Sequence, residues 1–138
     1  MDVNALTQSQ PLQAWVPFDD ESEILIAYVP RDELQNIFKR ATKIVYKNHK
    51  QIEEYDRTEG DRLLGRRAVK DWRPLEGNRG FTNDGQPFPC TPENIETLMT
   101  KWSAFAVFVN DACVNLEALA EIRKKDAIKN SLLTSGQG

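Results

Sequence analysis

Few residues of this 138-residue chain have the chemistry that catalysis needs. There are two cysteines, Cys90 and Cys113, and a single histidine, His49. A thiol nucleophile needs a base beside it, and one histidine distant in sequence does not favour such a dyad. The same three residues do not make a metal site. We therefore expect buried or half-buried thiols and a solvated histidine in a turn.

Other catalytic patterns are also missing from the sequence. Gly77 and Gly80 lie in a polar loop that follows a helical pattern, whereas a phosphate-binding loop follows a strand. There is no G-x-S-x-G and no H-E-x-x-H motif. The acid pairs at 19–20 and 53–54 are adjacent residues, which point to opposite faces of a strand and do not converge on one substrate. We expect a protein that is not an enzyme and has no cofactor and no metal.

Length and composition are those of one ordinary domain. The chain is 40% hydrophobic and 28% charged, and we expect a single domain over residues 1–130. Residues 1–13 are predicted to form a loose arm, and residues 131–138 a disordered tail. No apolar run approaches the roughly 18 residues of a membrane span. The first residues lack the pattern of a secretion signal, so a cytoplasmic location is expected.

Charge is unevenly distributed along the chain. Residues 1–36 hold seven acids and one base, whereas residues 37–73 hold eleven bases and six acids. The basic region 39–73 could bind nucleic acid or an acidic partner, and contacts would then include Arg66, Arg67 and Lys70. The alternative is a solvated face that offsets the acidic N-terminal third. We favour the alternative, because the pI is about 5.2 and no aromatic stacking motif accompanies the bases.

Two hairpins are predicted in the first half of the chain. The β-prone runs 15–18 and 24–29 are separated by an acidic turn, and Pro17 places the first run at a sheet edge. Both faces of the second run are apolar, so a second copy of the protein could cover one of them. An amphipathic helix over 34–41 follows. Residues 44–55 then favour a second hairpin that turns at Asn48, with a continued helix as the alternative.

Asp56 or Thr58 can cap the next predicted helix, which carries Leu64, Ala68 and Trp72 at successive i+4 steps. Gly60 and Gly65 weaken this helix, which indicates close packing against a neighbour or a helix that orders fully only on assembly.

The last third is predicted to be a short helix and then a long one. Thr91 can cap the short helix, with a proline at the first helical position, and Ser103 can cap the long one after a bend near Thr100. The apolar positions of the short helix are Ile95, Leu98, Met99 and Trp102, and those of the long helix are Phe105, Ala106, Val109, Cys113, Leu116 and Ala120, widened by Phe108, Ala112 and Leu119. Such a broad apolar face fits either core burial or binding of a partner helix or a second subunit. The expected fold class is α+β and mostly helical, with N-terminal hairpins and a long C-terminal helix.

One stretch carries a resemblance to a known family. The sequence VKDWRPLEG is followed by NDGQPFPCTPENIETLM, which resembles the tail assembly chaperones of long-tailed bacteriophages and prophages. In that family a helix ending in V-x-x-W-x-x-L precedes D-G-x-P-x-P-x-T-P-E-N and an apolar helix. The matching positions are Val69, Trp72, Leu75, Asp84, Gly85, Pro87, Pro89, Thr91, Pro92, Glu93, Asn94 and Leu98.

The resemblance implies a protein that binds the helix-rich tape measure protein, keeps it soluble and helps to recruit tail tube subunits. The predicted partner-contact residues are Trp102, Phe105, Phe108 and Val109, with Trp72 and Phe88 framing the loop. Ordinary core packing is the alternative for all six. Two other functions stay open at this point: a small prophage nucleic-acid-binding protein that uses the basic region 39–73, and a structural tail or head-completion protein.

Overall fold

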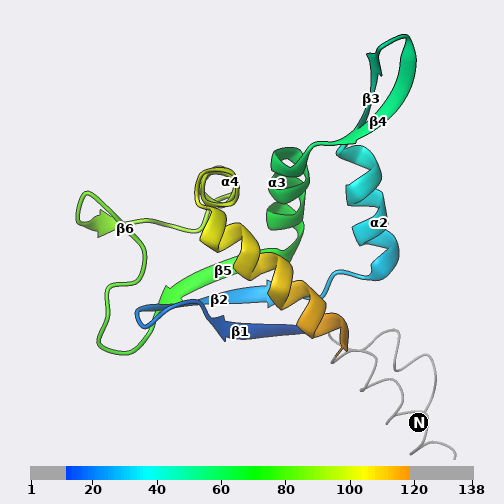
Figure 1. The fold of residues 1–138 in the computed structure, drawn as a ribbon. Coiled ribbons are helices and arrows are strands. Elements are labelled where there is room, and N and C mark those ends of the chain that lie inside the picture. The colour runs from blue at the N-terminus through cyan, green and yellow to red at the C-terminus, as the bar shows by residue number, and fades with distance from the viewer. Residues whose placement is uncertain (1–11, 119–138) are drawn as a thin grey trace, which may run out of the picture.

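The computed structural model describes residues 12–118, which form a mixed α+β unit. A three-stranded antiparallel sheet lies beneath the helices, and a two-stranded hairpin projects away from both (Figure 1). The elements in chain order are β1 (Gln13–Pro17), β2 (Ser22–Ala27), α2 (Arg31–Arg40), β3 (Thr42–Lys47), β4 (Lys50–Tyr55), α3 (Arg57–Ala68), β5 (Val69–Pro74), β6 (Thr82–Asn83), β7 (Gln86–Pro87) and α4 (Pro92–Lys101), followed by a helix over residues 103–118. The predicted α+β class is confirmed. Residues 1–11 of the predicted arm, the predicted tail, and Leu119 and Ala120 lie outside the described range. The arm was predicted to extend to residue 13, but Gln13 is already the first residue of β1.

The first predicted hairpin is present. Strands β1 and β2 pair with Trp15 opposite Leu25, and β1 is an edge strand of the sheet order β1-β2-β5, as Pro17 indicated. The acidic turn is held by Asp19, whose Oδ1 accepts hydrogen bonds from the backbone nitrogens of Glu21 and Ser22, both at 2.8 Å. An aspartate that bonds the amides two or three residues ahead is a common way to close a turn.

The prediction that Trp72 continues a helical stripe is wrong, because α3 ends at Ala68 and Trp72 lies on β5. In the pairing of β5 with β2, Val69 is opposite Ile26 and Asp71 is opposite Leu25, so Lys70 is an extra residue. Such a β-bulge changes which residues share a face. Val69 and Trp72, three positions apart, therefore both point into the core, and their spacing imitates a helix.

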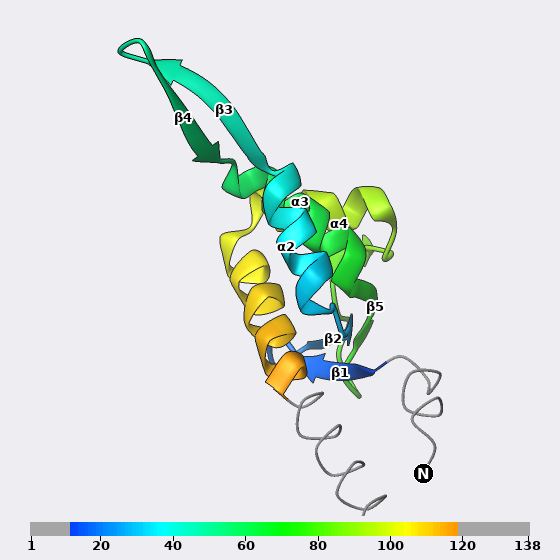
Figure 2. The ribbon, with the colours of Figure 1, turned by 90° about the vertical axis from the view of Figure 1, so that its right-hand side faces the viewer.

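The second predicted hairpin is also present, and the alternative of a continued helix is wrong. Strands β3 and β4 are joined by Asn48 and His49, with φ of 52° and 62°. Positive φ at both central residues is the signature of the type I′ turn, which matches the twist of the strands it joins. The hairpin extends beyond the end of α2 and α3 and away from the sheet (Figure 2).

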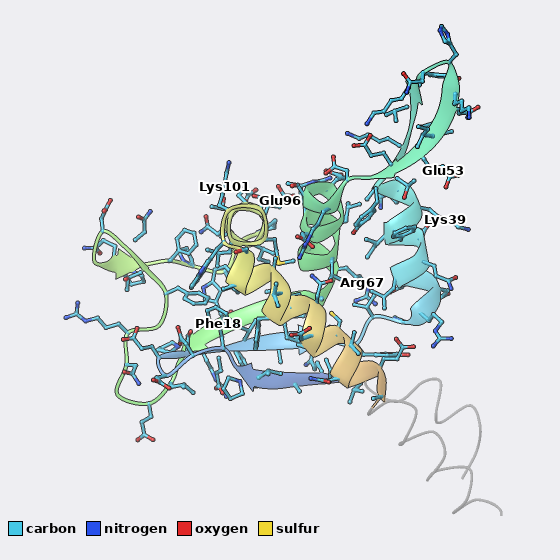
Figure 3. All side chains as sticks on the ribbon, in the orientation of Figure 1. Phe18, Lys39, Glu53, Arg67, Glu96 and Lys101 are labelled. Carbon is cyan, nitrogen blue, oxygen red and sulfur yellow. The ribbon has the colours of Figure 1, made fainter. Side chains whose placement is uncertain are left out.

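Helices α3 and α4 pack closely, as the glycines of α3 indicated. A Cβ at Gly65 would lie 2.3 Å from Cγ of Met99, and a Cβ at Gly60 would lie 2.0 Å from the hydroxyl of Tyr55. Arg62 of α3 joins Glu59 to Glu96 of α4, at 3.0 Å from the latter, and Figure 3 shows Glu96 on α4 facing α3. Both glycines thus mark close approaches, one to α4 and one to the base of the hairpin.

Helix starts follow the predicted caps with one exception. The Asp56 carboxylate accepts a hydrogen bond from the backbone nitrogen of Glu59 at 3.1 Å, and the Thr91 hydroxyl accepts one from that of Asn94 at 3.1 Å. Residue 103 already lies inside the last helix, so Ser103 is not its cap. The break falls at Trp102, whose carbonyl accepts from the backbone nitrogens of Phe105 and Ala106.

The core lies between the three helices α3, α4 and 103–118 and the face of the sheet that they cover, which is the upper face in Figure 1. Its fully buried large side chains include Ile24, Ile26, Met99, Phe105 and Val109. Among the described residues, no helix is both long enough and apolar enough to cross a membrane.

Candidate docking surfaces

An aromatic cluster closes one end of the sheet, around the turn between β1 and β2. The ring of Phe18 makes edge contacts with Phe81, Trp102, Phe105 and Phe108, with ring centroids 5.0 to 5.8 Å apart. Figure 3 labels Phe18 at this end of the sheet. The cluster joins the β1–β2 turn, the loop after β5 and the break before the last helix, which are far apart in sequence. The cluster reaches the surface at Trp102, which is 40% exposed.

The predicted contact residues divide between core and surface. Phe105 and Val109 are fully buried and Trp72 is 8% exposed, so these three pack the core and are not available to a partner. Phe88 and Phe108 are half-buried. Trp102, at the helix break, is 40% exposed. The structure therefore leaves Trp102 as the main surface residue of the predicted set.

A different apolar surface, which the sequence did not reveal, lies on the outer side of the last helix. Val107 and Val114 are 45% and 66% exposed, and Ala104 and Ala118 are exposed as well. With Asp111 these residues follow one another at alternating steps of three and four, which is the spacing of a coiled-coil seam. We call these five residues the outer seam. Sequence reasoning missed it because larger apolar residues on the opposite face dominated the pattern.

Two open hollows lie beside the C-terminal half of the outer seam, between α2 and the last helix. The larger, of about 730 Å³, is lined by Tyr28, Pro30, Arg31, Asp32, Val114, Glu117 and Ala118. The second, of about 360 Å³, is lined by Arg31, Leu34, Gln35, Phe38, Lys39 and Glu117. The Arg31–Glu117 ion pair, at 3.5 Å, stands between them. Val114 and Ala118 thus belong both to the seam and to the wall of a hollow.

The basic middle of the chain is largely neutralised within the molecule. Arg66 pairs with Glu96 at 3.3 Å, and Arg67 pairs with Glu33 at 2.7 Å. The further bases of residues 37–73 that have acidic partners are Lys43, Lys47, Arg57, Arg62 and Arg73. Two of these pairs, Arg67–Glu33 and Arg73–Glu23, join the basic region to the acidic N-terminal third. Lys70, the third predicted basic contact, is exposed on β5.

The thiols have the expected environment. Cys113 is buried and Cys90 half-buried, and neither is in a disulfide. Burial raises the pKa of both thiols to about 11, with a further upward effect on Cys90 from the charge of Asp71. A thiol with so high a pKa is a poor nucleophile at neutral pH. In the part of the chain that the structure describes, no three His, Cys, Asp or Glu side chains are grouped to hold a metal ion.

The projecting hairpin is the other unusual surface. Ile44, Tyr46, Ile52 and Tyr55 are between 43% and 77% exposed. The ring of Tyr55 stacks on Phe38 of α2 at 4.8 Å, which anchors the base of the hairpin. Partial burial and the nearby charge of Asp61 raise the pKa of the Tyr55 hydroxyl.

The chain was compared with protein-family models, curated proteins and solved structures, and none of them matches it.

Proposed function

We propose that this chain is a non-enzymatic tail assembly chaperone of a long-tailed phage or prophage, acting in the bacterial cytoplasm. It would bind a helical segment of the tape measure protein, keep that protein soluble and assist assembly of the tail tube. The proposal rests on the motif that runs from Val69 through the Thr91-Pro92 helix start to Leu98, together with the outer seam. The seam is the single structural observation that carries it.

The outer seam has the form that a helical partner needs. Apolar residues at alternating steps of three and four present a stripe to a second helix, and here the apolar members of the seam lie on either side of Asp111. Their side chains are valine and alanine, which are small enough to let a partner helix approach closely. Asp111 interrupts the stripe, so the matching position of the partner helix is expected to carry a basic or polar residue. The hollow lined by Tyr28 and Val114 gives room for larger partner side chains.

The ion pairs of the basic region argue against nucleic-acid binding as the main function. Phosphate binding would require Arg62, Arg66 and Arg67 to exchange carboxylates on their own chain for phosphates. It would also expose Glu96 and Glu33 as unpaired charges beside the nucleic acid, which repels them. A structural tail or head-completion protein is distinguished by its persistence in purified particles.

The test is co-expression with the tape measure protein encoded nearby, scoring its solubility and co-purification at about 0.15 M and about 1 M salt. Apolar helix docking predicts a complex that survives high salt, whereas phosphate-like or ion-pair binding predicts loss in high salt. Val107→Lys combined with Val114→Lys should abolish co-purification. Thr97→Lys combined with Thr82→Lys, which adds the same two charges at exposed sites on α4 and β6, should not.

A result with no complex and no gain in solubility at either salt concentration would rule out the proposal. So would a complex that the seam variant leaves intact while an Arg66→Glu, Arg67→Glu variant destroys it.

A further inference from the structure

Strand β4 has a free edge. All six of its residues are exposed, and β3 is its only strand neighbour among the described residues. Figure 2 shows the hairpin standing clear of the helices and the sheet, with nothing in the described fold beside β4. An unpaired edge exposes backbone donors and acceptors that can pair with another strand, and a lone two-stranded hairpin is only marginally stable in water.

The turn geometry fixes which backbone groups of β4 face outward. In a hairpin with a two-residue turn, the residues flanking the turn exchange backbone hydrogen bonds, here Lys47 and Lys50. Alternate residues along β4 then point their peptide groups toward β3, and those between them point outward. The outward groups are those of Gln51 and Glu53, with that of Tyr55 beyond them. Any added strand must hydrogen-bond to these odd-numbered residues.

The sequence of β4 is complementary to itself in one antiparallel register. We propose that two copies of this chain pair through β4, with a two-fold axis at Ile52. Gln51 of each copy would then be opposite Glu53 of the other as a hydrogen-bonded pair, as the outward peptide groups require. Ile52 would face Ile52 of the other copy, and Lys50 would face Glu54. These last pairs are non-hydrogen-bonded, the class in which side chains come closest.

The pairing would extend the apolar row on one face of the hairpin and supply an acidic partner for Lys50. Val45 is opposite Ile52 in the isolated hairpin, so the dimer would have a four-residue apolar row, Val45 and Ile52 of each copy. Lys47 pairs with Glu54 of its own chain at 3.7 Å, while no described acid pairs with Lys50, which faces Lys47 directly. Glu54 of the second copy would supply the missing partner and offset this like-charge contact.

Other registers and the other edge are less complementary. If the two-fold axis lay at Glu53 instead of Ile52, Glu53 of one copy would be opposite Glu53 of the other. If it lay at Gln51, Lys50 of one copy would be opposite Ile52 of the other. Strand β3 centred on Val45 would bring Lys43 opposite Lys47 of the second copy. Of these arrangements, only the pairing of two β4 strands centred on Ile52 places opposite charges facing each other and apolar residues facing each other. The pairing site lies on the hairpin and not on the outer seam. A test that rejects the pairing therefore leaves the chaperone proposal unaffected, and the reverse also holds.

Sedimentation equilibrium of the whole protein over a range of concentrations tests the pairing. A weak, concentration-dependent dimer is expected, because the contact is small. Lys50→Glu alone, and Glu54→Lys alone, should each raise the dimer dissociation constant about tenfold, since two attractive pairs become repulsive. The double variant Lys50→Glu, Glu54→Lys should restore it to within about threefold of the wild-type value.

Cross-linking tests the register itself. Ile52→Cys should form an intermolecular disulfide under mild oxidation, because facing non-hydrogen-bonded residues have Cα atoms about 4.5 Å apart, within disulfide range. Val45→Cys is the matched control: it lies on the same face but two strands farther from its counterpart, so it should not cross-link. A monomer at all concentrations would overturn the proposal. So would a dimer that both single charge variants leave unchanged, or equal cross-linking at both positions, which would point to another interface.

Discussion

The indole Nε1 of Trp72 donates a hydrogen bond of 2.7 Å to the backbone carbonyl of Phe88, and the two rings stack with centroids 5.9 Å apart. This contact joins the central part of β5 to the loop that precedes α4, sixteen residues further along the chain. The loop has little regular structure beyond the two-residue strands β6 and β7. Its position therefore depends on a few contacts with the core, and this is one of them.

Replacing Trp72 by Phe should lower the free energy of unfolding by about 2 kcal/mol. Phenylalanine keeps an aromatic ring but leaves a partly buried carbonyl without its donor and leaves unfilled volume in the core. Urea denaturation followed by circular dichroism measures the loss. Trp102→Phe is the matched control, and it should cost less than about 1 kcal/mol because Trp102 is 40% exposed. Equal losses at the two sites would contradict this role of Trp72.

Gly65→Ala should destabilise the protein by about 1–3 kcal/mol, although alanine is the better helix former by about 1 kcal/mol. The added methyl would lie 2.3 Å from Cγ of Met99, and Ile95 lies close on the same side, at 3.2 Å. In a Met99→Ala background the same substitution should become neutral or stabilising, because the space is then free. A double-mutant cycle measured by urea denaturation gives this difference. The same cost in both backgrounds would mean that another contact sets it.

Asp56→Ala should lower the midpoint of thermal unfolding by a few degrees at pH 7. The backbone N–H of Glu59, followed by the Lys43 ammonium, lowers the pKa of the Asp56 carboxyl. Because the folded-state pKa lies below the unfolded value of 3.8, the stabilisation is fully present above that pH. It is lost as the pH falls through the folded-state pKa.

The difference between wild type and Asp56→Ala should therefore shrink on acidification below about pH 4. Asp56→Asn keeps an oxygen that can cap the helix and should show a smaller loss at pH 7 with less dependence on pH. Thermal scans of the three proteins between pH 2.5 and 7 make the comparison. A gap that stays constant over this range would exclude an electrostatic contribution.

Both thiols should react slowly with alkylating or disulfide reagents in the folded protein at pH 8. Their pKa values of about 11 leave little thiolate, and Cys113 is only 2% exposed. Both thiols should react rapidly once the chain is unfolded in urea. Counting the thiols modified with time, with and without urea, is the measurement. A rapid reaction of one thiol in the native protein would contradict the described environment of Cys90.

The parts of the fold that local chemistry determines were predicted correctly. The caps at Asp56 and Thr91, the edge position of Pro17 and the turn at Asn48 each depend on residues within a few positions. Such features follow from backbone geometry and from single hydrogen bonds, so they can be predicted from the neighbouring residues alone.

Features that depend on a partner strand or on the packing of large residues were not predictable in the same way. The β-bulge at Lys70 made a strand look helical, because only the pairing with β2 reveals the extra residue. The candidate site shows the same limit. Phe105 and Val109 looked like partner contacts and are core, while the small residues of the outer seam, such as Val107 and Val114, are the ones exposed. Size and hydrophobicity marked the buried face of this helix rather than its exposed apolar face.

The central strand β2 has one neighbour close in sequence and one that is remote, and this sets an order for folding. Strand β1 is joined to β2 by a short turn, so their hairpin can form on the microsecond timescale. Pairing with β5 must wait until the intervening segment, which includes α2, the projecting hairpin and α3, has closed a long loop. The rate-limiting step should therefore be docking of β5 on β2. Substitutions on the exposed face of the β3–β4 hairpin should change self-association while leaving the refolding rate unchanged.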